Sequence, residues 1–390
     1  MDAYKQLLQK IEQLVPDTDF LELSPESTLG AVLQQDVNSD LDMPSFHKSA
    51  VDGFACRAED LELELVINES IPAGEMPSLP VAPGTCTRIM TGAPVPEGAD
   101  TVFMIEDAVV KDKRVRCTNP NSKRNICYLG EDFRKGDTLL KKGVILQPQH
   151  LPVLAGAGLK NVLVAKKPGI ALLVTGSELV DYPEKPEGGK IRNTNGIQLM
   201  AALEKMHMPA EYLGMCPDDE TLLKERFLRA ASENRIVILT GGAAVGDFDL
   251  VPKILKDTGY TIQWDRTGLK PGNPMSFAIK GRSYVFGLSG NPVSSFVQFE
   301  YLVKPVLYRL MGAGYRPFNI TATMAGHYFR KNASRMGVVP VRLNSEGMVE
   351  ELPFNGSAHI HALALADAFL EIPAGIKELK KGEKVNVRPI

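Results

Sequence analysis

The stretch Ile170-Ala-Leu-Leu-Val-Thr175, followed at once by Gly176-Ser-Glu178, decides the fold of this chain. A short apolar run that stops at a glycine turn is typical of a buried strand. Beyond it the pattern alternates, and we expect helices at 194–207, 219–232, 248–257 and 293–311 and strands at 210–215, 235–240 and 284–288. This βαβ series predicts a doubly wound α/β domain over 166–314, with a mostly parallel sheet covered on both faces.

The segments on either side of this series have different patterns. Tyr4, Leu7 and Ile11 recur at helical spacing, and a second helical piece lies near 149–158, so we expect an N-terminal helical domain made of 1–45 and 144–165. Short apolar stretches between Gly and Pro, as in Thr91-Gly-Ala-Pro-Val-Pro96, predict an inserted β-rich domain over 46–143. Alternating strands and turns after the α/β series predict a small β domain over 315–390.

Composition and charge limit the classes of function. The 390 residues carry 44 basic and 47 acidic side chains, a formal charge of −3, with no long run of like charge, so we expect no nucleic-acid or membrane partner. The five cysteines form no CxxC pair, which favours buried thiols in a reducing compartment. The N-terminal residues lack the pattern of a signal peptide, and we therefore expect the cytoplasm.

Three glycine-bearing loops follow predicted strands, at Thr175-Gly-Ser-Glu178, Thr240-Gly241-Gly242-Ala-Ala-Val-Gly246 and Leu288-Ser-Gly290-Asn291-Pro292. Glycine lets backbone approach a ligand, and free N–H groups at a helix start favour an anion. Any one of these loops alone is better interpreted as a tight turn between strand and helix than as a ligand site. The three together predict an anion site beyond the strand ends. Lys270, beside Pro271 and near Arg266, adds a cation held between turn residues.

Acidic residues gather at the same predicted strand ends: Glu178, Asp218, Asp219, Asp247 and Asp249. Helix capping explains Asp218, Asp219 and Asp249 adequately. Beside an anion site, such carboxylates are also suitable ligands for Mg²⁺, which prefers oxygen and bridges to phosphate. No GxSxG, HExxH or Walker loop is present in the sequence.

Several stretches, taken in order, resemble the molybdopterin molybdenumtransferase family, which is related to the E domain of gephyrin. The stretches are Ser49-Ala-Val-Asp-Gly-Phe-Ala55, Ile89-Met-Thr-Gly-Ala-Pro-Val-Pro-Glu-Gly-Ala-Asp100, Gly130-Glu-Asp-Phe-Arg-Lys-Gly136, Thr175-Gly-Ser-Glu-Leu179, Gly241-Gly-Ala-Ala-Val-Gly246, Lys270-Pro-Gly272 and Phe286-Gly-Leu-Ser-Gly-Asn-Pro-Val-Ser294. The resemblance runs nearly end to end. It implies an elongated N-terminal helical domain, an inserted β-rich domain, the α/β domain as the molybdopterin-binding part, and a C-terminal domain like a small β-barrel.

The resemblance also implies an activity and a set of partners. Members of the family insert molybdate, a co-substrate, into adenylylated molybdopterin with release of AMP, and they require Mg²⁺. They are homodimers, in which the site of one subunit faces the inserted domain of the other. Other proteins that make the molybdenum cofactor are the remaining expected partners.

By motif position, the resemblance implies roles for individual residues. Lys270, Ser294, Arg335 and Ser357 match the molybdate-binding set, with Arg266 as a further cation on the phosphate side. Gly241, Gly242, Gly290 and Asn291 match the loops that bind substrate. Glu178, Asp218 or Asp219, and Asp249 match the essential acids, and we expect Glu178 and Asp249 to hold the metal. Asp52 and Thr91 match inserted-domain residues that reach across the dimer.

The sequence departs from the family pattern at a few positions. Asn273 replaces a second lysine, Ser289 replaces a proline, Ala244 replaces a serine, and His361-Ala362 replaces a serine pair. None of these removes an assigned residue. Two alternatives stay open at this point: a catalytically impaired scaffold or carrier that binds molybdopterin, and a molybdopterin adenylyltransferase, whose relatives share the α/β domain alone.

Overall fold

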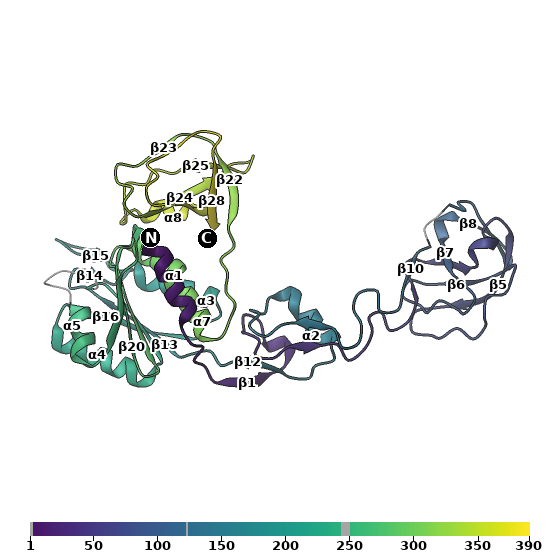
Figure 1. Ribbon diagram of the computed structural model, residues 1–390, viewed down its shortest axis with the longest axis horizontal. Helices are drawn as coiled ribbons and strands as arrows, with labels where there is room; N and C mark the ends of the chain where they lie inside the picture. Colours follow the sequence, from purple (N-terminus) through teal and green to yellow (C-terminus); the bar gives the residue numbers. More distant parts are fainter. Residues whose placement is uncertain (1–2, 122–123, 243–249) are drawn as a thin grey trace. The chain divides into compact units, whose positions relative to one another are not determined.

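The computed structural model describes residues 3–121, 124–242 and 250–390 (Figure 1). The chain forms two compact units. One comprises Met1–Gln35, Lys142–Pro148 and Asn161–Ile390, and the other comprises Asp36–Lys141 and Gln149–Lys160. The four domain boundaries expected from the sequence are finer than this division and stay a prediction. Within the described ranges, no helix is both long and apolar enough to cross a membrane.

A six-stranded sheet forms the centre of the first unit, and its strands lie in the order β16 (Ala210–Cys216), β13 (Ile170–Thr175), β17 (Ile236–Thr240), β21 (Ser283–Leu288), β20 (Pro274–Lys280) and β18 (Thr261–Arg266). The first four strands run parallel, as predicted. Strand β20 is antiparallel to both β21 and β18, so β20 runs against the other five strands of this sheet; neither β20 nor β18 was predicted from the sequence.

Helices cover both faces of this sheet. Ile170 and Leu172 of β13 belong to one buried cluster, whereas Ala171 and Leu173 belong to another, because successive side chains of a strand point to opposite faces. The first cluster includes residues of α1 (Ala3–Gln13), α3, α6 and α7, and the second includes residues of α4 and α5. Their bounds are α3 Asn195–Lys205, α4 Glu220–Glu233, α5 Leu250–Asp257, α6 Pro292–Gln298 and α7 Lys304–Leu310, with a π-helical turn at Phe299–Val303. The doubly wound arrangement is confirmed.

The N-terminal helix α1 (Ala3–Gln13) was predicted from its apolar spacing, and it packs against α7. The chain that follows α1 is fixed to the sheet by Asp17, whose carboxylate forms an ion pair with Arg235 and accepts a hydrogen bond of 2.7 Å from the Tyr284 hydroxyl. Burial alone would raise the pKa of Asp17, but the hydrogen bonds from Arg235 and Tyr284 lower this pKa below its ordinary value. The ionised carboxylate is therefore stabilised by folding.

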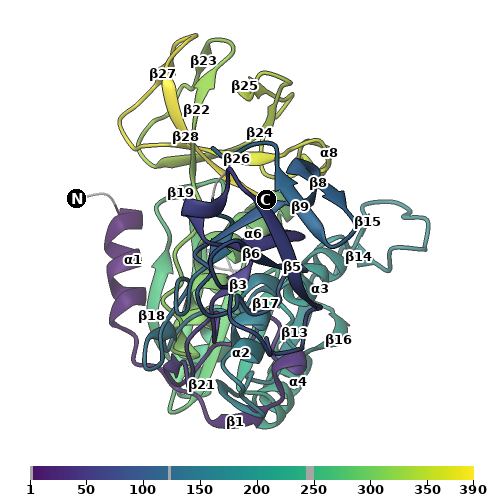
Figure 2. The same ribbon diagram turned by 90° about the vertical axis from the view of Figure 1, so that its right-hand side faces the viewer.

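A small barrel ends the chain. Its strands are β22 (Ile320–Met324), β24 (Met336–Leu343), β25 (Met348–Glu351), β26 (Ala368–Ile372) and β28 (Lys384–Pro389), and pairing of β24 with β26 closes it. Figure 2 shows β22, β24, β26 and β28 in its upper part, coloured green to yellow. The C-terminal β-barrel expected from the family resemblance is thus present. The remaining elements of this segment are β23 (Tyr328–Phe329), β27 (Glu378–Leu379) and α8 (Ile360–Ala364).

Two features join the barrel to the α/β domain. Strand β19 (Leu269–Lys270) adds to the barrel beside β24, with Lys270 opposite Gly337. Arg388 of β28 is buried; its guanidinium lies 3.7 Å from the centre of the Tyr301 ring and 2.9 Å from a carboxylate oxygen of Glu371. The two domains are therefore joined by a shared sheet and by the contact of a barrel arginine with Tyr301 of the α/β domain.

The second unit is rich in strands, as predicted for the inserted domain. One sheet has the order β7 (Thr101–Met104), β4 (Gly53–Cys56), β6 (Thr85–Ile89), β5 (Glu64–Ile71), β9 (Arg114–Cys117) and β8 (Ala108–Lys111). Two short strand pairs are formed by segments that precede and follow this sheet in the chain: β2 (Val37–Asn38) with β11 (Thr138–Leu140), and β3 (Lys48–Ser49) with β10 (Ile126–Cys127). Helix α2 (Leu151–Gly156) matches the second predicted helix. In the first unit, β1 (Phe20–Leu23) pairs with β12 (Val162–Ala165), so the segments predicted as helical also contain strands.

Candidate functional site

The three glycine loops meet at one edge of the central sheet. Thr240 pairs with Val174 on one side and with Leu288 on the other, so the three strand ends are neighbours. Gly241 has φ +97°, and a Cβ there would lie 1.9 Å from the backbone oxygen of Thr175. Only glycine fits such a position without moving the backbone. A Cβ on Gly290 would lie 3.5 Å from the Gly241 Cα, so the loops are in close contact.

The four residues that match the molybdate-binding set line one cavity of about 430 Å³, which we name the anion cavity; they are Lys270, Ser294, Arg335 and Ser357. They are far apart in the sequence, and two local connections bring them together. The pairing of β19 with β24 places Lys270 next to the start of β24, and the Val293 N–H donates to the Ser357 carbonyl over 3.0 Å. Ser294 lies in the first turn of α6 and is buried.

The anion cavity is electropositive. Among the residues that the structure describes, neither the Lys270 ammonium nor the Arg335 guanidinium has a carboxylate partner. A third cation of the lining, Arg330, is largely buried and donates to four backbone carbonyls, including that of Arg335 at 3.1 Å. Uncompensated cations beside two hydroxyls favour a compact dianion.

A second cavity, of about 280 Å³, is built on the glycine loops, and we name it the loop cavity. Thr175, Glu178, Thr240 and Gly290 line it, and so does Asn195 at the start of α3. Asn291 lines both cavities, so they are neighbours. Of the remaining loop residues, Gly241 and Gly242 pack behind the cavity rather than lining it.

The predicted acids have different positions. The Asp218 carboxylate accepts from the Thr175 hydroxyl (3.0 Å) and from the Ser177 N–H (2.9 Å), so both its oxygens hold the first glycine loop. Asp219 caps α4 by accepting from the Leu222 N–H at 2.8 Å. Glu178 is exposed and lines the loop cavity. Asp249 lies outside the described residues. The geometry therefore leaves Glu178 as the carboxylate best placed for a ligand among these.

Three further predicted residues do not belong to the lining of either cavity. Arg266 ends β18, is exposed and lines neither cavity. Asp52 and Thr91 belong to the other compact unit, where one Asp52 oxygen accepts from both the N–H and the hydroxyl of Thr91, each at 2.7 Å. The backbone and side-chain hydrogen bonds from Thr91 lower the pKa of Asp52 below its ordinary value. Asp52 and Thr91 thus form one preorganised pair.

Two departures from the family pattern have a local structural reason. The Asn273 side-chain oxygen accepts from the Gly268 N–H at 3.1 Å, which a lysine could not do. The Ser289 N–H donates to the Gln298 side chain at 2.8 Å, which a proline could not do. His361 is exposed on α8, and Ala244 lies outside the described residues. Asn273 and Ser289 therefore stabilise the ligand loops by hydrogen bonds of their own.

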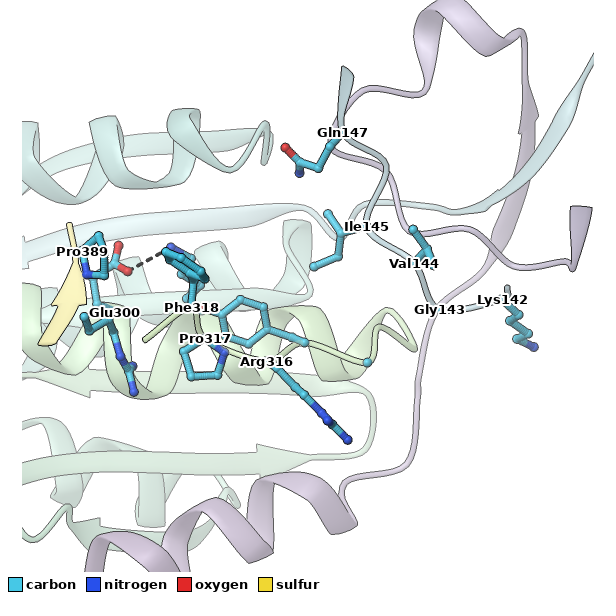
Figure 3. A pocket seen from close by; sticks show the side chains of 14 residues that line it. Lys142, Gly143, Val144, Ile145, Gln147, Glu300, Arg316, Pro317, Phe318 and Pro389 are labelled. Atoms are coloured by element: carbon cyan, nitrogen blue, oxygen red, sulfur yellow. Dashed lines mark hydrogen bonds and ion pairs between the residues drawn. The ribbon is translucent and has the colours of Figure 1, made fainter. Parts of the chain in front are cut away.

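A larger cavity of about 730 Å³ lies elsewhere in the same unit (Figure 3). Its lining includes Lys304 and Arg388, and both are paired with carboxylates: Lys304 with Glu300 at 2.9 Å, and Arg388 with Glu371. No glycine loop at the end of a sheet strand contributes to its lining. Lys142 and Arg316 also line it, so cations are present here too, but the three glycine loops are absent from its described lining, and size alone does not make it the better anion site.

The sequence analysis missed three buried polar residues of the site: Asn195, Gln298 and Arg330. Gln298 was the easiest to find, because it is a polar side chain within the apolar run Phe296-Val-Gln-Phe299. A buried amide needs hydrogen-bond partners, so such a position indicates a structural connection. Arg330 and Asn195 carry no such local signal, because charged and polar residues surround them in the sequence.

Comparison with known proteins gives a consistent assignment. Residues 1–158 match the model of the MoeA N-terminal region (domain I and II), residues 171–309 match a probable molybdopterin binding domain, and residues 323–390 match the MoeA C-terminal region (domain IV). A molybdopterin molybdenumtransferase from Staphylococcus aureus is 34% identical over 394 residues, covering 98% of this chain and 94% of that protein. One from Staphylococcus epidermidis is 33% identical over 396 residues, covering 99% and 94%.

Solved structures agree with this assignment. The crystal structure of the molybdopterin biosynthesis moeA protein from Pyrococcus horikoshii OT3 has a TM-score of 0.76 and 29% identity, and the alignment covers 100% of both chains. The family models and the relatives together span both compact units and the barrel. The chain belongs to the MoeA family of molybdopterin molybdenumtransferases.

Proposed function

We propose that this protein inserts molybdate into adenylylated molybdopterin, with release of AMP, to give the molybdenum cofactor. The observation that carries the proposal is the pair of adjoining cavities, one with uncompensated cations and the other built on three glycine loops. The relatives with this name align over nearly the whole chain, which supports the same reaction here. We propose the cytoplasm as its location.

The anion cavity is the proposed molybdate site. Molybdate is a dianion, and binding it requires donors that compensate for the loss of water. Lys270 and Arg335 supply charge, while the hydroxyls of Ser294 and Ser357 supply neutral donors. A charged donor to a charged acceptor makes a stronger hydrogen bond than a neutral pair. We assign binding and orientation of molybdate to these four side chains.

The loop cavity is the proposed site for the anionic part of the second substrate. Backbone N–H groups at glycine loops and helix starts favour phosphate oxygens. Gly290 and Asn291 lie at the start of α6, and Thr175 and Glu178 lie at the end of β13. Because Asn291 lines both cavities, we propose that the two substrates bind side by side and that the transfer takes place between neighbouring groups. We also assign Gly241 and Gly242 to this side, because Gly241 packs against the Thr175 backbone, and we assign Arg266 to it by motif position alone.

We further propose that Mg²⁺ assists the reaction, with Glu178 and Asp249 as its protein ligands. In the described part of the chain, no three His, Cys, Asp or Glu side chains gather as a metal site. Mg²⁺ nonetheless fits, because it keeps several waters and commonly takes one or two carboxylates together with substrate phosphate. The exposed Glu178 carboxylate at the loop cavity meets this need. When bound, Mg²⁺ would neutralise charge on the phosphate link.

We propose that the active form is a homodimer, in which Asp52 and Thr91 of each subunit serve the site of the other. Their mutual hydrogen bonds keep the Asp52 carboxylate ionised and oriented. Other proteins of molybdenum cofactor synthesis would deliver the substrate and receive the product. Sedimentation of the purified chain tests the dimer, and a monomer with full activity would contradict it.

The test of the function is AMP release from adenylylated molybdopterin, with and without molybdate and Mg²⁺. We expect release to require both ions, and we expect Glu178→Ala to abolish it. An adenylyltransferase would instead form adenylylated molybdopterin from molybdopterin and ATP. A scaffold or carrier would bind the substrate without turnover, and either result would contradict the proposal.

A further inference from the structure

The segment 289–291 separates the two cavities of the site, and we name it the partition. Ser289 lines the anion cavity, Gly290 lines the loop cavity, and Asn291 lines both. These residues connect β21 to α6 and contain an exposed glycine. Short, exposed loops of this kind do not define their own geometry. The residues that hold the partition in place therefore determine the relative positions of the two bound substrates.

Gln298 holds the partition from the side of the anion cavity. Its side chain is fully buried in α6, and its oxygen accepts from the Ser289 N–H at 2.8 Å. Its amide nitrogen donates to the carbonyls of Gly272 (3.0 Å) and Pro274 (2.6 Å), which belong to the loop that follows Lys270. One side chain thus ties the partition to the loop that carries the proposed molybdate-binding lysine.

Asn195 holds the partition from the side of the loop cavity. It is 6% exposed, and its nitrogen donates to the Gly290 carbonyl and to the Thr240 hydroxyl, each at 2.8 Å. The Thr240 hydroxyl donates in turn to the Ser289 carbonyl at 3.0 Å. A carbonyl cannot donate, and the Thr240 hydroxyl already donates its hydrogen, so both groups can only accept from Asn195. The NH₂ group of Asn195 must therefore face them. Asn195 thus ties the partition to the end of β17 and the start of α3.

We propose that Asn195 and Gln298 are positioning residues that set the partition between the two substrates, each governing the cavity on its own side. Gln298 sets the position of the Lys270 loop and therefore the affinity for molybdate. Asn195 sets the positions of Gly290 and Thr240 and therefore the affinity for adenylylated molybdopterin. This inference rests on the proposed function. Neither side chain is assigned contact with the reacting atoms.

The two residues would otherwise be ordinary buried amides that stabilise the fold. A purely structural amide, when replaced, lowers stability and leaves the affinities of the remaining folded molecules unchanged. A positioning residue shifts the affinity for one substrate selectively, because a small displacement of binding groups alters the fit on one side only. The Michaelis constants for the two substrates separate these alternatives.

The experiment compares Gln298→Met and Asn195→Leu, which keep the side-chain volume without the amide and add no charge near the anions. We expect Gln298→Met to raise the KM for molybdate about tenfold or more, with the KM for adenylylated molybdopterin changed less than about threefold. We expect Asn195→Leu to show the opposite pattern. If Gln298→Met does not fold, Gln298→Asn, which is shorter by one methylene, replaces it.

Gln34 supplies the matched control. It is 7% exposed, its amide donates to the Met311 carbonyl at 2.7 Å, and it lines neither cavity. Gln34→Met should lower the melting temperature without changing either KM. Equal shifts of both constants in the site variants, or no shift, would overturn the inference while wild-type activity stands. Absence of molybdate-dependent AMP release in the wild type would overturn the proposed function instead.

Discussion

Replacement of Lys270 by alanine should separate molybdate binding from folding. Lys270 is exposed and has no ion pair among the residues that the structure describes, so its loss should change the free energy of unfolding by less than about 0.5 kcal/mol. A hydrogen bond between charged groups contributes about 1.5–3 kcal/mol. At about 1.4 kcal/mol for each factor of ten, the dissociation constant for molybdate should rise roughly 10- to 160-fold.

The assay measures molybdate affinity by calorimetric titration and stability by urea unfolding on the same samples. Lys381→Ala is the control, because Lys381 is exposed on the barrel and lines neither cavity. It should leave both quantities unchanged. The reasoning would be refuted if Lys270→Ala lost as much stability as binding energy, or if its molybdate affinity equalled that of the wild type.

Three predictions concern stability. Gly241→Ala should lower the free energy of unfolding by about 3 kcal/mol, because its Cβ would lie 1.9 Å from a backbone oxygen. The control Gly281→Ala, whose Cβ would have no atom within 4 Å, should lower it by only about 1 kcal/mol. Equal losses in urea unfolding would count against this prediction. Asp17→Asn should destabilise the protein by about 2 kcal/mol at pH 7. Hydrogen bonds from its arginine and tyrosine partners lower the pKa of Asp17, so this contribution is present above the ordinary carboxyl pKa and is lost as the pH falls through the folded value. Unfolding curves of wild type and variant should therefore converge below about pH 4, and a constant gap would contradict the argument. Glu371→Gln should cost about 3 kcal/mol in thermal unfolding, because it leaves Arg388 buried without its carboxylate, and an unchanged melting temperature would show that the pair contributes nothing.

The α/β domain was predictable from sequence because its strands are continuous apolar runs. All six residues of β13 and all five of β17 are buried. Strand β18 escaped prediction because Trp264 alone of its six residues is buried. Strand β20 begins at Pro274, shortly after the turn residue Pro271, and these two prolines obscured its apolar run in the sequence. The barrel was expected, but its attachment through β19 depends on a pairing across 66 residues that no local pattern reveals.

The candidate site was predicted in part. The glycine loops follow from local sequence, because turns at the ends of adjacent parallel strands must meet. That Lys270 and Arg335 would share a cavity followed only from the family resemblance. The sequence could not distinguish the roles of the two acids, which depend on their hydrogen bonds. Asp218 holds the first glycine loop, whereas Glu178 is exposed at the loop cavity. Gln298 depends wholly on tertiary partners, so its role needed the structure.

We propose that molybdate and adenylylated molybdopterin meet in two adjoining cavities of one site. The most direct test measures the molybdenum bound to pterin product for each AMP released in a single turnover. We expect one molybdenum per AMP, and we expect Lys270→Ala to keep this ratio while reaching the wild-type rate only at raised molybdate concentration. AMP release that proceeds at the full rate without molybdate, leaving pterin free of metal, would contradict it.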